Sequence, residues 1–193
     1  MSVYKELKNH APFTFLATLI AVLVVVFINF HLKKIIIKDI FHFFHFFHIF
    51  VSALTTSALF YKYRKKPIIA FLIGILGSIF IGSISDIILP YLGGLVFNLN
   101  IHFHLPLIQE TLLTLVSSFV GASLGILFLL TKFSHFLHVF LSVFASLFYL
   151  LTFTANFVFS YFLVSFFIVF LAVIIPCCIS DIVFPLLFVK KID

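Results

Sequence analysis

Six long apolar runs constrain this chain more than any other feature. They are approximately residues 12–30, 40–61, 67–90, 105–130, 135–152 and 157–188. Each is long enough to cross a hydrocarbon core of about 30 Å as a helix, which takes roughly 20 residues. None alternates apolar and polar residues as a membrane strand does, so helices are expected. With 64% hydrophobic and 9% charged residues among 193, the chain has more apolar surface than a soluble core would hide. The sequence predicts an all-α polytopic membrane protein embedded in a lipid bilayer.

The basic residues indicate how the helices are oriented. The net charge is +6, and alternate loops carry most of it, as expected when cytoplasmic loops are enriched in Lys and Arg. The positions assigned to the cytoplasmic side are Lys5, Lys8, Lys62, Arg64, Lys65, Lys66, Lys132, Lys190 and Lys191, against Lys33, Lys34 and Lys38 on the other side. We therefore expect a multi-pass protein of the cell (inner) membrane with both termini cytoplasmic. Because topology accounts for the charge, no nucleic-acid partner is expected.

Scarce polar residues recur in order in the two halves of the chain. Residues 45–61 align with 135–151, which pairs His45 with His135, His48 with His138 and Ser52 with Ser142. At a slightly larger offset, the Ser-Asp-x-x-x-Pro motif at 85–90 matches the one at 180–185. A weaker match pairs His10-x-Pro12 with His104-x-Pro106. This pattern indicates an internal duplication.

The duplication predicts two inverted repeats of three helices each. A copy with three crossings enters the membrane from the side opposite to its partner, as in many transporters. We expect a cytoplasmic lead at 1–11, repeat 1 at 12–92, a hinge at 93–104 and repeat 2 at 105–193. The expected layout is similar in architecture to that of small cation exporters, such as the manganese and lysine exporter group. No residue role is carried over from them, because their acidic signature motifs are absent here.

The recurring side chains are candidate metal ligands. A carboxylate inside a membrane costs about 2.5–3.5 kcal/mol on insertion scales, so it needs a partner. Imidazole nitrogens and carboxylate oxygens bind zinc, manganese, nickel, cobalt or iron. The predicted ligands are His45, His48, Asp86, His135, His138 and Asp181. A second tier comprises His10, His104 and Glu110, and Ser52, Ser85, Ser142 and Ser180 are expected to orient the ligands.

The expected function is transport of a divalent transition-metal cation, coupled to protons if the same groups titrate. One central site and two flanking sites are both compatible with the sequence, as is a homodimer. No enzyme motif is present, so no catalytic residue is predicted, although a membrane metalloenzyme stays an alternative. A haem-binding subunit and a non-catalytic anchor or assembly subunit are further alternatives. His42 is interpreted as a headgroup contact, and Cys177 and Cys178 have no assigned role.

Overall fold

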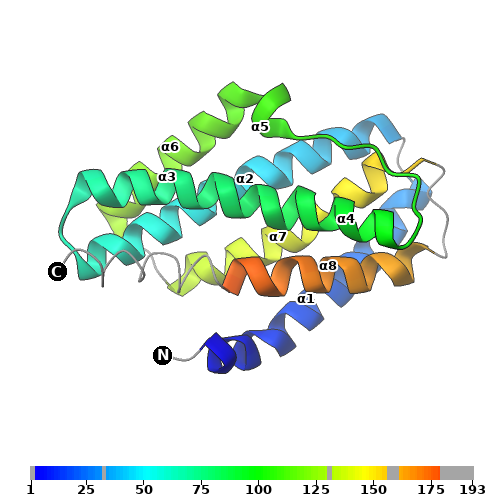
Figure 1. Ribbon diagram of the computed structural model, residues 1–193, viewed down its shortest axis with the longest axis horizontal. Helices are drawn as coiled ribbons and strands as arrows, with labels where there is room; N and C mark the ends of the chain where they lie inside the picture. The colour runs from blue at the N-terminus through cyan, green and yellow to red at the C-terminus, as the bar shows by residue number, and fades with distance from the viewer. Residues whose placement is uncertain (1–2, 32–33, 130–131, 156–160, 179–193) are drawn as a thin grey trace.

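The protein is a bundle of α-helices in the computed structural model. The structure describes residues 3–31, 34–129, 132–155 and 161–178, with side-chain surroundings at 11–27, 38–129, 137–155 and 161–176. The helices are α1 (Val3–His31), α2 (Lys34–Tyr63), α3 (Pro67–Ser83), α4 (Leu89–Val96), α5 (Pro106–Gln109), α6 (Thr111–Phe128), α7 (Lys132–Phe153) and α8 (Tyr161–Cys178). A π-helical turn, η1 (Ile84–Ile88), joins α3 to α4. The long helices run back and forth along the long axis of the molecule (Figure 1).

Length and composition mark three described stretches as able to cross a membrane. These are Lys38–Tyr63, Pro67–Val96 and Thr111–Phe128, while Ala11–Phe27, Leu137–Phe153 and Tyr161–Pro176 are shorter apolar helices. Large apolar side chains of α6 are exposed, including Leu112, Phe119 and Leu127. Side chains of this kind face lipid when a bundle lies in a bilayer. The all-helical class is thus confirmed, and three of the described helical stretches are long and apolar enough to cross a membrane.

Polar side chains gather inside the bundle. Helix α2 packs against α3, α6 and α7, so it is the central helix, whereas α1 packs mainly against α8. Buried hydroxyl groups line the inner part of α2 and α7, including Ser52, Thr56, Ser142 and Ser146. The interior is therefore more polar than the outer surface of α6, as suits a protein whose solvent is hydrocarbon.

Glycines allow α6 to approach α2 closely. A Cβ atom added to Gly121 would collide with the backbone carbonyl of Phe50, and one added to Gly125 with that of Leu54. The small-residue face expected from the Gly-x-x-x-Gly spacing is present. Gly74 of α3 meets α2 in the same way, since its added Cβ would lie 2.8 Å from the Cβ of Ser57.

Two local details depart from the simplest interpretation of the sequence. Pro12 lies inside α1, which begins at Val3, rather than opening the helix. Gly93 and Gly94, the first residues of the predicted hinge, lie inside α4. Their role is packing, because an added Cβ would lie 2.6 Å from Ile168 at Gly93 and 3.2 Å from Ile101 at Gly94. The segment between the halves begins only after α4.

Replacing Gly121 should loosen the α2–α6 contact. Gly121→Ala forces the Phe50 backbone to move, and overpacking of this kind costs about 1–3 kcal/mol. For a chain of this length, that lowers the thermal midpoint by roughly 2–10 °C. The midpoint can be measured in detergent. Val120→Ala, on the exposed side of the same helix, is the matched control, and equal midpoints for the two variants would contradict this packing.

Candidate functional site

Three histidines of α2 face the interior of the protein. His42, His45 and His48 recur every third residue, so successive rings lie about 4.5 Å apart along the helix axis. His45 and His48 are fully buried, and His42 is partly buried. The expectation that this stripe faces protein rather than lipid is confirmed.

Asp86 is the centre of a buried hydrogen-bond network. His45 Nδ1 and His48 Nδ1 both donate to Asp86 Oδ2, at 2.9 and 2.6 Å. Asp86 lies in the π-helical turn η1 and is fully buried. A π-turn inserts one residue into a helix and is frequent at functional sites. Here it interrupts the path from α3 to α4 at the residue that carries the charge.

Residues of the second half complete this network. Ser142 of α7 donates to Asp86 Oδ1 at 2.8 Å, as does the neighbouring Ser85 at 2.8 Å. Ser146 donates to the backbone carbonyl of Ser85 at 3.0 Å. Asp86 therefore accepts four hydrogen bonds, which stabilise its ionised form. The donors come from α2, η1 and α7, so the network ties both halves of the chain together.

The two α2 histidines present their remaining ring nitrogens to the interior. With Nδ1–H given to the carboxylate, each neutral ring carries its lone pair on Nε2. His45 Nε2 and His48 Nε2 are buried and have no hydrogen-bond partner among the described residues. The His48 ring contacts the fully buried His138 ring of α7, with centroids 4.5 Å apart.

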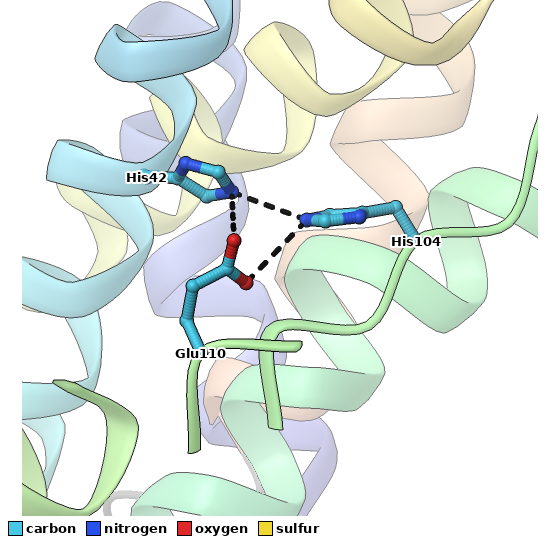
Figure 2. A group of neighbouring side chains, drawn as sticks. All are labelled: His42, His104 and Glu110. Carbon is cyan, nitrogen blue, oxygen red and sulfur yellow. Dashed lines mark hydrogen bonds and ion pairs between the residues drawn. The ribbon is translucent and has the colours of Figure 1, made fainter. Parts of the chain in front are cut away.

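A second group lies nearer the start of α2 and joins His42, His104 and Glu110. Figure 2 shows the three side chains pointing toward one another, His42 from α2 and the others from the segment between α4 and α6. His42 Nε2 and His104 Nε2 are 3.1 Å apart. Glu110 Oε1 lies 3.6 Å from His42 Nε2, and Glu110 Oε2 lies 3.7 Å from His104 Nε2. Among the described residues, this is the group of three ligand atoms that all lie within 4.8 Å of one another.

These separations suit one small metal ion. In a tetrahedral site with metal–ligand bonds of about 2.0–2.2 Å, two ligand atoms lie about 3.3–3.6 Å apart. The observed 3.1, 3.6 and 3.7 Å bracket that range. The side chains of His42, His104 and Glu110 are 16%, 12% and 26% exposed, so an ion can reach them.

Local structure holds the group in place. Pro106 starts α5, and the backbone breaks at Glu110, which lies between α5 and α6 with φ −124° and ψ 47°. The break turns the Glu110 side chain toward His42 and His104 (Figure 2). The His104 ring stacks on Phe153 with centroids 4.5 Å apart, and its backbone N–H donates to the Tyr149 hydroxyl at 3.2 Å.

Burial of this group favours the neutral, metal-binding form of histidine. Burial lowers the pKa of the His104 imidazole below its ordinary value, and the nearby Glu110 carboxylate opposes part of that change. A neutral imidazole is the form that binds a metal. Glu110 Oε2 is buried without a hydrogen-bond partner among the described residues, so it is free to accept a cation.

The structure brings some of the predicted residues together and leaves others untested. His45, His48 and Asp86 converge with Ser85 and Ser142, and His138 joins them. Their metal role stays a prediction. Ser52 is buried, but its hydroxyl has no partner among the described residues. The side chains of His10, His135, Ser180, Asp181, Cys177 and Cys178 lie outside the described part of the chain.

The structure also changes how the second tier is grouped. His104 and Glu110 join His42, which the sequence analysis interpreted as a headgroup contact. The sequence signal that could have identified His42 as part of a polar group was its three-residue spacing from His45, which repeats from His45 to His48. The helix break at Glu110, which completes the group, is not visible in the sequence.

Comparisons with known proteins gave no match for the chain. No protein-family model, no curated protein sequence and no solved structure matches it.

Removing the Asp86 carboxylate should destabilise the bundle more than neutralising it. Asp86→Ala removes the acceptor shared by two buried imidazole N–H groups and two serine hydroxyls, and breaking a buried ionic network costs about 3–5 kcal/mol. Asp86→Asn keeps one acceptor oxygen, so it should destabilise the protein less than Asp86→Ala does. Thermal unfolding in detergent measures both, with the exposed Asp39→Asn as control. If Asp86→Ala and Asp39→Asn unfold alike, the network does not stabilise the fold.

Proposed function

We propose that the protein is an integral membrane carrier of a divalent transition-metal ion. The observation that supports this most directly is the group of His42, His104 and Glu110, whose ligand atoms lie within 4.8 Å of one another in an apolar helical bundle. In this proposal six helices cross the membrane as two inverted copies of three, and both termini are cytoplasmic. The outer group receives the ion.

The chemistry of the three side chains favours zinc or a similar ion. Two imidazoles and one carboxylate are ligands used for Zn²⁺ and for Fe²⁺ in proteins. Three protein ligands leave a coordination position open for water or for a further ligand. An incompletely enclosed ion of this kind can be released again, which a carrier requires. Zinc is therefore the first ion to test, followed by iron, manganese, cobalt and nickel.

The position of the group along α2 agrees with a role at one membrane face. His42 lies near the start of α2, and the basic run from Lys62 to Lys66 follows about 30 Å further along, at 1.5 Å per residue. That distance is close to the thickness of a bilayer core. By the positive-inside rule, the basic end is cytoplasmic and the His42 end is external.

The contacts of the buried histidines disfavour haem as the occupant. Axial haem ligands need the macrocycle between them. The His48 and His138 rings touch at a centroid distance of 4.5 Å, which leaves no space for it. We assign the ion to the outer group alone, because among the described residues it is the group that offers three ligand atoms within 4.8 Å of one another.

Zinc binding should depend on the outer group. Glu110→Gln and His104→Gln each remove a ligand atom, and the expected loss of affinity exceeds about tenfold, since even an outer hydrogen-bond partner of a ligand is worth about 10–100-fold. Isothermal titration of the detergent-purified protein measures the affinity. His102→Gln, an exposed histidine outside the group, should bind zinc as the parent does. If all three variants bind zinc with the same affinity, zinc does not bind at His42, His104 and Glu110.

Zinc movement tests the carrier function itself. Proteoliposomes that contain a zinc-sensitive dye should fill faster with the parent protein than with Glu110→Gln, and His102→Gln should match the parent. An anchoring subunit would bind soluble partners and move no zinc. Flux equal to that of protein-free vesicles would therefore refute the carrier.

A further inference from the structure

No lysine or arginine among the described side chains is hydrogen-bonded or ion-paired to Asp86. The described Lys and Arg side chains lie toward the ends of the molecule, at Lys38 and from Lys62 to Lys66. A buried carboxylate without a cation is costly even when it is well hydrogen-bonded. Its charge must be balanced by a group inside the bundle, and the two histidines that it binds are the nearest titratable ones.

Those histidines can each take up one proton without losing their bond to Asp86. Nδ1 donates to the carboxylate, and Nε2 is buried and without a hydrogen-bond partner among the described residues. A proton that binds Nε2 turns one imidazole into an imidazolium beside the carboxylate, so the pair becomes neutral. When the proton leaves, the negative charge returns. Imidazole is the side chain whose ordinary titration lies nearest to neutral pH.

Few other titratable groups surround this centre. The elements packed on η1 are α3, α4, α7 and α8. Among the residues whose side-chain surroundings are described, α3 supplies none, α4 supplies Tyr91, α7 supplies His138 and Tyr149, and α8 supplies Tyr161. His138 contacts His48 directly. It is therefore a third imidazole through which the proton can move within the interior.

We infer that Asp86, His45 and His48 form a proton-binding centre that exchanges its proton for the cation received at His42, His104 and Glu110. This inference rests on the proposed carrier function. His42 and His45 lie on neighbouring turns of α2, and the buried ring of Phe41 contacts both groups. It stacks on His45 at 5.7 Å and meets His104 edge-on at 6.2 Å. A dication on one side of this ring disfavours a second positive charge on the other. Binding of the metal thus favours loss of the proton, which is the basis of exchange.

The arrangement also connects the proton to the two halves of the chain. His48 and His138 are equivalent positions of the duplication, and Ser142 reaches across from α7 to Asp86. A movement of one half relative to the other would change these two contacts together. The affinity of the centre for a proton would change with them, which makes Ser142 a positioning residue.

The centre can be tested without any metal. Nitrogen NMR of the purified protein, with ¹⁵N-labelled histidine and signals assigned by His45→Gln and His48→Gln, reports whether each Nε2 is protonated. In the parent, at least one of the two should bind a proton and release it again as the pH of the sample is changed. In Asp86→Asn that change should be lost, because the carboxylate no longer stabilises the imidazolium. If neither Nε2 changes in the parent, the proton centre is refuted.

The exchange is tested in proteoliposomes with a zinc dye and a pH dye. Zinc entry through the parent should drive protons outward, and His102→Gln should behave identically. Asp86→Asn should lose this proton movement while it still binds zinc in solution, because the ligand atoms of His42, His104 and Glu110 are unchanged. Proton movement at the parent rate in Asp86→Asn, or zinc entry without protons in the parent, would overturn the exchange. A parent that moves no zinc would refute the carrier instead and leave the NMR result standing.

Discussion

A single buried carboxylate organises the interior of this protein. Asp86 accepts hydrogen bonds from two histidines of α2, from its neighbour Ser85 and from Ser142 of α7. In a hydrocarbon environment no water is available to replace a missing donor. The three elements must therefore pack so that all four donors reach one residue. This requirement couples the central helix to the second half of the chain.

Close packing makes that convergence possible. Gly121 and Gly125 let α6 lie against the α2 backbone, and Gly74 does the same for α3. Helix α2 is thereby enclosed by its neighbours and can hold its histidines away from lipid. At the start of the same helix, the break at Glu110 brings a carboxylate to His42 and His104. One helix thus contributes to an accessible group of two imidazoles and a carboxylate and, about one turn deeper, to a buried charged network.

The helical class could be predicted because it depends on local composition. Long apolar runs have to satisfy their backbone groups internally, so they form helices whatever their neighbours are. Details that depend on neighbours were wrong. Gly93 and Gly94 read as a hinge but are packing positions beside Ile168 and Ile101. Pro12 was expected at the start of a helix, but α1 begins nine residues earlier, at Val3.

The sequence by itself determined that His45, His48 and Asp86 need partners inside the bundle. Polar side chains within apolar helices have no water to form hydrogen bonds with, so they must form them with other protein groups. It also identified Ser142 as a supporting group. Only the tertiary structure decided that both imidazoles share one carboxylate oxygen, and that His42 belongs with His104 and Glu110. The physical reason is that these contacts join residues 38 to 68 positions apart, through a π-turn and a helix break that local residue preferences do not specify.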